Sequence, residues 1–390
     1  MLQLIDRESI TLINRLAKAY PVIFITGPRQ SGKSTLAKMA FPKKKYVSLE
    51  DIDQASMAKA DTKGFLSAFP DGCIIDEVQR VPEILNYLQG IVDSDNRTGL
   101  FVLTGSNQFS IHDKINQSLA GRTGNLVLLP FSCQELKKAG ILSKTPEEAI
   151  FKGGYPPIYS RHADCRLWLS DYIMTYLERD IRQIINLKNL DSFQRFLGLC
   201  AGSIGQTVDY VKLGGVCGIS HTTAREWLNI LEASHVVYRL KPYFSNIKKR
   251  LIKTPKLYFG DTGLACRLLG ISSPTQLKTH YAYGFLFENL VLLELLKWNH
   301  NTRSDWNFSF FRTYEGLEVD IIIERDCHLD AIECKAGTTF STDWLHSMEK
   351  WKEHVPEKML GTMNLVYGGN DDTSLNGNKM ISWSNISEKT

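Results

Sequence analysis

The sequence predicts an α/β fold in three parts: a parallel-sheet domain, a helical middle region and a second α/β domain. Three observations support this division. Residues 27–34 read Gly-Pro-Arg-Gln-Ser-Gly-Lys-Ser, a glycine-rich turn between an apolar run and a helix-forming stretch. Short apolar runs then recur at intervals as far as residue 129. In the last third, an aspartate and a Glu-x-Lys triplet lie in consecutive apolar runs.

Length and composition indicate a globular protein. The chain has 390 residues, which suggests two or three domains. Its hydrophobic content of 43% and charged content of 23% are typical of a chain with a packed core. The net charge of +4 is too small to indicate a nucleic-acid partner, but residues 206–256 hold nine Lys and Arg against three Asp and Glu. Such a local excess is typical of a nucleic-acid-binding surface.

Cysteine usage and the N-terminus both favour the cytoplasm. The eight cysteines form no Cys-x-x-Cys pair, and several lie in apolar runs, so we expect reduced core thiols rather than disulfides or zinc ligands. Charged residues at positions 6–8 come too early for a signal peptide. No run approaches the roughly 18 apolar residues of a membrane span. We therefore expect a cytoplasmic protein with no membrane partner.

Residues 27–34 match the phosphate-binding pattern G-x-x-x-x-G-K-[ST] in a strand–loop–helix setting. Gly27 and Gly32 would let the backbone curve so that its N–H groups point at phosphate oxygens. Lys33 would reach the outer phosphates, and the Ser34 hydroxyl would bind Mg²⁺. The alternative is a chance glycine-rich turn. The nucleotide-binding residues that the pattern predicts are Gly27, Pro28, Arg29, Gln30, Ser31, Gly32, Lys33, Ser34 and Thr35.

Four further apolar runs follow the loop, with helix-compatible stretches between them. Short buried strands that alternate with helices predict a parallel sheet covered on both faces. These runs are residues 46–49, 73–75, 100–103 and 126–129.

Polar residues end two of these runs. Asp76 and Glu77 follow the second run, where Asp76 would bind Mg²⁺ and Glu77 would orient the attacking water of an ATPase. The third run ends in Thr104-Gly105-Ser106-Asn107, where Asn107, or failing that Ser106, would lie beside the γ-phosphate and help to hold the water. The alternatives are a solvated strand end for the carboxylates and an ordinary turn for Asn107.

Taken in order, the loop, the Asp-Glu strand, the polar strand end and Leu119-Ala120-Gly121-Arg122 resemble the AAA-type ATPases over roughly residues 1–140. The resemblance implies that the chain binds and hydrolyses Mg-ATP. In that superfamily an arginine near the position of Arg122 often acts as a finger on the phosphate of a neighbouring subunit, which implies a homo-oligomer. Arg97 is a second candidate for the finger, and a surface salt bridge is the alternative role of Arg122.

The middle of the chain begins at Gly153-Gly154-Tyr155-Pro156-Pro157, a strong break. Apolar spacing then predicts helices over residues 164–202. Residues 207–243 are compatible with a helix, a glycine-containing turn, a second helix capped by Ser220, and a strand.

This order resembles a winged helix, in which the second helix enters the major groove of DNA. The alternative is a helical lid that packs on the ATPase domain and binds no DNA. The DNA-binding residues that the resemblance implies are His221, Thr222 and Arg225 toward the bases, and Lys248, Lys249 and Arg250 toward the phosphates.

The last third contains a helix-forming stretch with Glu288 near its start, followed by three strand-like runs. Asp320 lies in the second run, and twelve residues separate it from Glu333-Cys334-Lys335 in the third. Since side chains alternate along a strand, Glu333 and Lys335 would share a face. Asp320 and Glu333 would bind a divalent metal, and Glu288 would complete its shell or hold Lys335. Lys335 would position the attacking water or stabilise the developing charge.

These residues resemble the core of PD-(D/E)xK restriction-endonuclease-like proteins, with Val319 in place of the usual proline. The resemblance implies metal-dependent DNA cleavage with Asp320, Glu333 and Lys335 as catalytic residues. Charged residues inside apolar strands are costly unless they are functional or paired, which favours a site. The alternatives are a nuclease-like scaffold without activity and a salt-bridged cluster without metal.

The whole order resembles a prokaryotic family of AAA-type ATPases whose C-terminal domain has no settled function. It favours a Mg-ATP-dependent ATPase coupled to DNA binding and to DNA cleavage. One alternative is a nucleotide-dependent switch that binds protein or DNA without cutting; a small-molecule kinase is disfavoured because no acceptor domain follows. The predicted parts are an ATPase domain at 1–150, a helical and winged-helix-like region at 151–270, a nuclease-like domain at 271–367 and a loosely ordered tail at 368–390.

Overall fold

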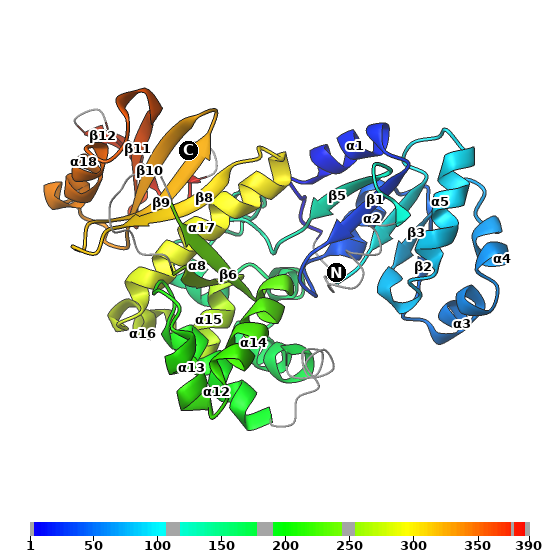
Figure 1. The fold of residues 1–390 in the computed structure, drawn as a ribbon, viewed down its shortest axis with the longest axis horizontal. Coiled ribbons are helices and arrows are strands. Elements are labelled where there is room, and N and C mark those ends of the chain that lie inside the picture. The colour runs from blue at the N-terminus through cyan, green and yellow to red at the C-terminus, as the bar shows by residue number, and fades with distance from the viewer. Residues whose placement is uncertain (1–3, 107–117, 178–189, 244–253, 376–377, 387–390) are drawn as a thin grey trace.

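The computed structural model describes residues 4–106, 118–177, 190–243, 254–375 and 378–386. Two β-sheets lie toward opposite ends of the molecule, with helices of the middle region below and between them (Figure 1). The structure confirms the mixed α/β class, with a parallel-sheet N-terminal domain and a β-rich C-terminal domain.

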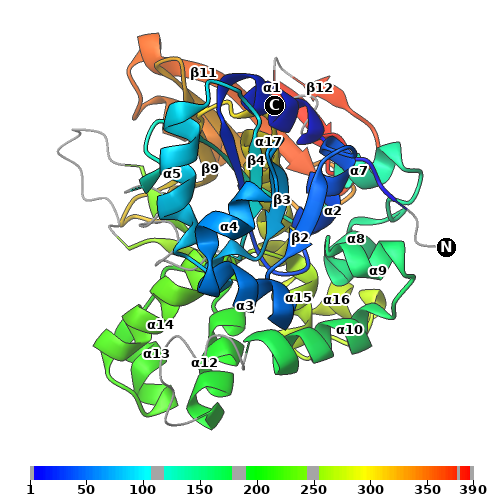
Figure 2. The ribbon, with the colours of Figure 1, turned by 90° about the vertical axis from the view of Figure 1, so that its right-hand side faces the viewer.

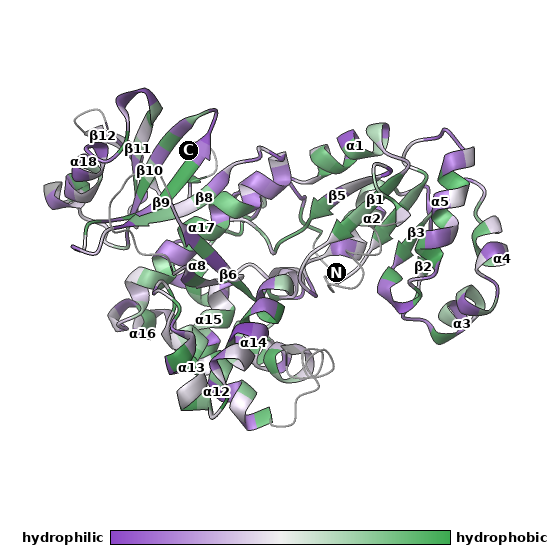
Figure 3. Ribbon diagram, in the orientation of Figure 1, coloured by the Kyte–Doolittle hydropathy of each residue, from purple (hydrophilic) through white to green (hydrophobic). Residues whose placement is uncertain are grey.

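The N-terminal sheet has five strands in the order β2-β3-β4-β1-β5, and each neighbouring pair is parallel. Its central strands are buried along their whole length, as their apolar sequences predict (Figure 3). Because the strands are parallel, their carboxyl ends meet at one edge of the sheet. The elements are α1 (Ile10–Ala19), β1 (Val22–Thr26), α2 (Lys33–Ala40), β2 (Lys45–Ser48), α3 (Ile52–Ala60), α4 (Thr62–Ser67), β3 (Cys73–Asp76), η1 (Val78–Arg80), α5 (Ile84–Ser94), β4 (Phe101–Thr104) and β5 (Thr123–Val127).

The middle region is mainly helical. Its buried apolar side chains form one core together with those of the C-terminal domain. The start of this region reaches the N-terminal sheet, where α9 lines the same pocket as α2, and Figure 2 shows α9 on the side of α2. Its elements are α7 (Cys133–Lys138), α8 (Pro146–Lys152), α9 (Pro156–Ser160), α10 (Cys165–Tyr172), the π-helical turn η2 (Ile173–Leu177), α12 (Leu190–Gly202), α13 (Tyr210–Cys217), α14 (His221–Ala233), β6 (Val237–Pro242), β7 (Lys256–Phe259), α15 (Thr262–Leu268) and α16 (Pro274–Thr279).

The C-terminal sheet has eight strands in the order β12-β13-β11-β10-β9-β8-β6-β7. Strands β8, β9 and β10 form an antiparallel meander, and β11 joins β10 in parallel after an intervening helix. The elements are α17 (Tyr283–Thr302), β8 (Asn307–Arg312), β9 (Glu318–Arg325), β10 (His328–Lys335), η3 (Thr342–Leu345), α18 (His346–Lys352), η4 (Glu357–Met359), β11 (Leu360–Tyr367), β12 (Thr373–Leu375) and β13 (Asn378–Ser382).

Two features of this sheet differ from the sequence-based division. Strands β6 and β7 come from the middle region, yet β6 pairs in parallel with β8, so the sheet crosses the predicted border at residue 270. The segment expected to be a loosely ordered tail instead contributes β12 and β13. Strand β13 pairs with β11 and buries Met380 and Ile381, and Trp383 directly after it is buried too, which outweighs the polar composition around the strand.

All eight cysteines are free thiols. Five are buried and Cys165 and Cys334 are partly buried, but Cys327 is exposed, contrary to the expectation of core positions throughout. Among the helices that the structure describes, none combines the length and the apolar character that crossing a membrane requires.

Candidate functional site

The glycine-rich loop joins β1 to α2 at the carboxyl edge of the N-terminal sheet. Gly27 adopts φ +140°, and a Cβ there would lie 2.2 Å from the carbonyl oxygen of Leu128. Gly32 adopts φ +94°, and α2 begins directly after it. These two positions therefore require glycine, one for close approach and both for backbone conformation.

Lys33 lies buried at the start of α2, next to a pocket of about 360 Å³. Its Nζ donates to the carbonyl oxygens of Gly27 (3.2 Å) and Pro28 (2.8 Å). Burial lowers the pKa of Lys33 to about 8, although the carboxylates of Glu77 and Asp76 act to raise it. The Lys33 side chain thus extends from the start of α2, where the motif places it, to the first residues of the loop.

Asp76 ends β3 and accepts hydrogen bonds from three hydroxyl groups. Ser34 donates to one carboxylate oxygen at 2.7 Å and Tyr46 to the other at 2.6 Å, and Thr104 also donates to this carboxylate. The predicted pair of Ser34 and Asp76 is therefore in direct contact. The sequence did not predict a role for Tyr46. Its position on β2, the strand that pairs with β3, brings its hydroxyl to Asp76.

Glu77 follows Asp76 in the left-handed backbone conformation, with φ 57°. Its N–H donates to the hydroxyl of Thr104 at 3.2 Å, and its carboxylate accepts from the side-chain amide of Gln79. Gln79 also donates to the hydroxyl of Ser106 at 2.9 Å. Burial raises the pKa of Glu77, while Lys33 acts to lower it. Ser106 and Glu77 are therefore linked through the side-chain amide of Gln79. Asn107 lies outside the described residues.

The pocket has a second wall that the loop motif does not predict. It is lined by the N-terminal segment, by α2 and by α9, which begins within the Gly153–Pro157 break. This wall is partly apolar and carries two arginines. Its lining residues include Ile5, Arg7, Met39, Pro156 and Arg161. Nucleotide-binding residues assigned from the motif that also line the pocket are Arg29, Gln30, Gly32, Lys33, Ser34 and Thr35.

The two finger candidates pair within the chain. Arg122 makes two contacts with Asp93 of α5, and Arg97 pairs with Asp95 at 2.7 Å. Neither arginine is among the described residues that line the pocket. The surface salt bridge weighed for Arg122 is therefore present, and a finger role in an oligomer stays a prediction.

The C-terminal sheet holds a second cluster of charges. Asp320 on β9 lies across from Glu333 on β10, one position beyond the Ile321–Ile332 pair. Lys335 Nζ lies 2.7 Å from one oxygen of Glu333, and Asp320 accepts the N–H of Cys334 at 2.9 Å. The other Glu333 oxygen is buried and has no hydrogen-bond partner among the described residues. Burial, followed by the charge of Asp320, raises the pKa of Glu333 to about 8.

Glu288 on α17 has different partners from those expected. Its carboxylate contacts Lys256 Nζ at 2.8 Å and accepts the hydroxyl of Tyr258, both on β7. Lys256 also lies 2.5 Å from Glu318. Lys256 and Tyr258 are thus the side-chain partners of Glu288 here, and a place for Glu288 in a metal shell stays a prediction. Within the described part of the chain, no group of three His, Cys, Asp or Glu side chains is arranged to hold a metal ion.

Lys256 is the residue that sequence reasoning missed in this cluster. Its side chain is 1% exposed. Burial opposes its charge, but Glu288, Asp320 and Glu318 raise its pKa. Burial raises the pKa of Glu288 to about 7 even with Lys256 beside it. Lys256 lies in β7, outside any motif, so only the pairing of β6 with β8 brings it here.

Lys256→Met is expected to lower the free energy of unfolding by about 3–5 kcal/mol, because it leaves Glu288 buried without its cation. The measurement is urea unfolding followed by circular dichroism. Lys241→Met is the matched control, since Lys241 is exposed on the adjacent strand β6. Equal stability of the two variants would contradict a structural role for the Lys256–Glu288 pair.

The middle region contains the predicted helix–turn–helix. Helix α13 ends at Cys217, Gly218 is left-handed, and Ser220 caps α14 by accepting the N–H of Thr223 at 3.0 Å. His221, Thr222 and Arg225 are exposed along the first turns of α14. The residues expected to contact phosphates, Lys248, Lys249 and Arg250, lie outside the described residues.

Comparison with known proteins separates the chain into three matched segments. Residues 19–137 match the family described as AAA domain. This segment of the chain is therefore similar to an AAA domain. Residues 143–275 match a domain of unknown function, DUF8612, and residues 283–386 match another, DUF4143. The segment similar to an AAA domain contains the loop, Asp76, Glu77 and all five strands of the first sheet.

Individual relatives differ in the share of the chain that they match. An uncharacterized protein of Mycobacterium tuberculosis is 28% identical over 368 residues, which are 93% of this chain and 80% of that protein. An uncharacterized protein of Haemophilus influenzae is 24% identical over 240 residues, 57% of each chain. The structure of a Walker-type ATPase of Pyrococcus abyssi covers 68% of this chain and 96% of its own, with 16% identity and a TM-score of 0.46.

Proposed function

We propose that the AAA domain binds Mg-ATP at the loop and hydrolyses it. The observation that carries this proposal is the contact of Ser34 with Asp76 beside the buried Lys33, at the edge of one pocket. A hydroxyl and a carboxylate are oxygen donors of the kind that Mg²⁺ prefers, so these residues fit the ion. Bound there, Mg²⁺ would neutralise charge on the phosphates.

The remaining residues have separate tasks in this proposal. Backbone N–H groups of the loop and Lys33 bind the phosphates, and Lys33 leaves its two loop carbonyls to do so. Glu77 orients the attacking water and accepts its proton, with its carboxylate held by Gln79. The apolar side chains of Ile5, Met39 and Pro156 suit the flat base of the nucleotide.

The test is phosphate release from ATP by the whole chain, with and without Mg²⁺. We expect turnover that requires Mg²⁺. A folded preparation that binds no ATP would overturn the proposal, and one that binds ATP without turnover would restrict it to a nucleotide-dependent switch.

ATP affinity is expected to fall as pH rises through about 8. Below that pH, Lys33 carries its charge before the nucleotide arrives; above it, binding must first add a proton. Affinity should therefore weaken by up to about tenfold per pH unit above the pKa, until the pKa in the complex is reached. Titration calorimetry in two buffers of different ionisation enthalpy would detect the proton uptake. The same affinity one pH unit on either side of the pKa would contradict this prediction.

We infer a second candidate activity for the C-terminal domain, metal-dependent cleavage of DNA. It is favoured by the buried Glu333 oxygen without a partner, next to Asp320 and Lys335. In this candidate, Asp320 and Glu333 hold a divalent ion, and Lys335 stabilises the developing charge. The order of helix α17, the antiparallel meander β8–β10, α18 and the parallel strand β11 supports the resemblance to nuclease-like proteins.

DNA contact would fall to the exposed start of α14, where His221, Thr222 and Arg225 lie. The test incubates plasmid and linear DNA with Mg²⁺ or Mn²⁺, with and without ATP. We expect cleavage by the wild type and by Glu315→Ala, an exposed control in the same domain, and loss of cleavage in Glu333→Ala and Lys335→Ala. No cleavage by protein that still hydrolyses ATP would overturn this candidate.

A further inference from the structure

Arg7 lies outside every motif in the sequence, yet its guanidinium contacts the phosphate loop. The side chain is 5% exposed and reaches the loop from the segment before α1. Its Nη1 donates to the carbonyl oxygen of Ser31 at 3.0 Å, and its Nη2 donates to that of Leu129. The remaining nitrogen, Nε, donates to Glu135 at 2.9 Å. All three nitrogens of the guanidinium are therefore engaged with protein oxygens.

The contact between Arg7 and the Ser31 carbonyl affects the direction in which the N–H of Gly32 points. In a trans peptide unit the carbonyl and the following N–H point in opposite directions. A donor that holds the Ser31 carbonyl on one side therefore fixes the N–H of Gly32 on the other. Gly32 lines the pocket and adopts φ +94°, a conformation that glycine reaches easily and also leaves easily.

The two ends of the loop are held by different cations. Lys33 holds the carbonyls of Gly27 and Pro28 at the start of the loop. In the proposed function Lys33 moves from these carbonyls to the phosphates. Arg7 has no comparable reason to move, because its partners are a carboxylate and two carbonyls of the protein itself.

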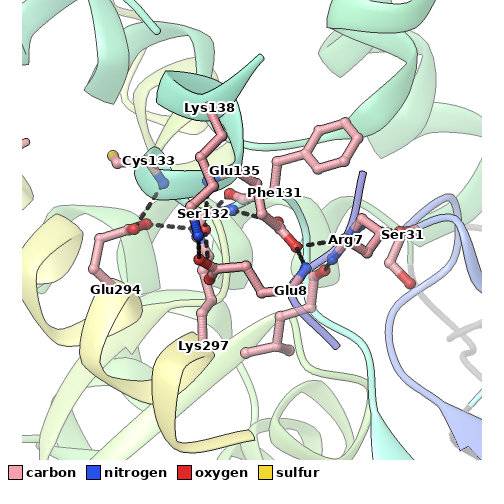
Figure 4. A network of polar contacts seen from close by, with 11 residues as sticks. Arg7, Glu8, Ser31, Phe131, Ser132, Cys133, Glu135, Lys138, Glu294 and Lys297 are labelled. Carbon is pink, nitrogen blue, oxygen red and sulfur yellow. Dashed lines mark hydrogen bonds and ion pairs between the residues drawn. The ribbon is translucent and has the colours of Figure 1, made fainter. Parts of the chain in front are cut away.

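The 131–135 segment, which contacts Arg7, is held by further polar contacts (Figure 4). Glu135 accepts from Arg7 and also from the N–H groups of Glu8 and Ser132, each at 2.9 Å. Glu135 and Ser132 form a capping box at the start of α7. The guanidinium carbon lies 4.7 Å from the centre of the Phe131 ring.

Helix α17 of the C-terminal domain secures the same segment from its other side. Glu294 accepts the N–H of Cys133 at 2.7 Å, and Lys297 donates to the carbonyl of Phe131 at 2.8 Å and to Glu294 at 2.9 Å. Figure 4 shows these contacts and those of Arg7 on opposite sides of the 131–135 segment. The position of Arg7, and through it the loop, thus depends on a C-terminal helix.

We propose that Arg7 is a positioning residue for the phosphate loop, holding the Ser31–Gly32 peptide so that its N–H faces the nucleotide. This inference rests on the proposed nucleotide site. A purely structural role is the alternative, because a buried Arg–Glu pair contributes to folding wherever it lies. The two roles differ in what an Arg7 variant changes: a structural role alters unfolding, and a positioning role also alters nucleotide binding by folded protein.

The experiment compares Arg7→Lys with Glu135→Gln. Arg7→Lys keeps a cation opposite Glu135 but loses the fork that reaches Ser31. Glu135→Gln removes the charge of the pair and keeps an acceptor for Nε, so the contact with Ser31 stays. For each protein we would measure the melting temperature without nucleotide, the dissociation constant of a non-hydrolysable Mg-ATP analogue, and KM and kcat for ATP.

We expect Arg7→Lys to weaken analogue binding and raise KM by about tenfold, the loss of one charge-assisted hydrogen bond, with a smaller change in kcat. Glu135→Gln should lower the melting temperature and leave binding within about twofold of the wild type. Wild-type affinity in Arg7→Lys, or equal loss in both variants, would overturn the inference.

Two further results keep the test decisive. If Arg7→Lys does not fold, the double variant Arg7→Gln/Glu135→Gln, which buries no unpaired charge, replaces it and carries the same expectation against Glu135→Gln. If the wild type itself binds no analogue, the nucleotide site fails rather than the role of Arg7 within it.

Discussion

Lys33→Ala is expected to reduce ATP hydrolysis by about a hundredfold or more, the usual effect of removing one preorganised group that stabilises transition-state charge. Lys33 is a buried cation that lines the pocket, and Asp76 and Glu77, which line it too, are both acidic. Without it, the phosphates would meet two carboxylates and lose the lysine that the motif places at the start of α2. ATP affinity should fall together with turnover. Phosphate release and analogue binding measure the two effects.

The same variant is expected to fold at least as well as the wild type. Burial lowers the pKa of Lys33 to about 8, so at neutral pH the folded protein carries a charge that burial disfavours. Removing the charge removes that disadvantage, and thermal unfolding should show no loss of stability. Lys43→Ala, at an exposed lysine outside the pocket, is the matched control for activity. Turnover by Lys33→Ala near the wild-type rate would place the hydrolytic site elsewhere.

The residues that sequence reasoning assigned to the loop and to Asp76 are those that a local pattern determines. A strand, a turn with glycine at fixed positions and a helix specify where Gly27, Lys33 and Ser34 must lie. The run 73–75 predicts that Asp76 ends a buried strand, and parallel neighbours then bring it to the same sheet edge. The structure places Ser34 and Asp76 in contact for this reason.

Residues supplied by distant segments carried no such signal. Arg7 reaches the loop from the N-terminal segment, and Arg161 lines the pocket from the residue after α9. Lys256 enters the C-terminal cluster only because β6 pairs with β8 across some seventy residues. A lone basic residue in each of these segments is indistinguishable in sequence from one on a solvated surface. The chain must fold before these side chains acquire partners.

Two expectations differ from the structure because contacts between distant segments determine it: strand pairing in one case and an ion pair in the other. The Asn- and Ser-rich stretch after residue 367 reads as disordered, but its short apolar run 380–383 has a parallel partner in β11. Glu288 was expected to complete the metal shell of Asp320 and Glu333 or to hold Lys335, because a helix that carries a glutamate precedes the resembling strands. The sheet instead brings Lys256 between Glu288 and Glu318, which pairs Glu288 with a cation.

Helix α17 links the two clusters physically. Its early turns carry Glu288 to Lys256, and its later turns carry Glu294 and Lys297 to the segment that supports Arg7. One helix of twenty residues therefore contacts both the C-terminal charge cluster and the 131–133 segment next to Arg7. Helix α17 is therefore the element through which the two candidate activities would be coupled.

Glu77→Gln is expected to leave ATP bound and to reduce its hydrolysis by about a hundred- to ten-thousandfold, the range of a general base. The amide keeps the size of the side chain, so the left-handed backbone at Glu77 and its N–H bond to Thr104 should persist. What is lost is the negative charge that accepts a proton from water. The same change also removes a carboxylate near Lys33, which should strengthen the affinity for phosphates rather than weaken it.

Binding and turnover must therefore move in opposite directions in this variant, unlike in Lys33→Ala, where both fall. The measurement is a single-turnover assay with radiolabelled ATP, which separates bound nucleotide from product. Glu83→Gln provides the control, because Glu83 is an exposed glutamate outside the pocket lining. Unchanged hydrolysis in Glu77→Gln would reassign the water-orienting role to another group near the Thr104 strand end. Ser106 would be the first candidate, since it shares the Gln79 amide with Glu77.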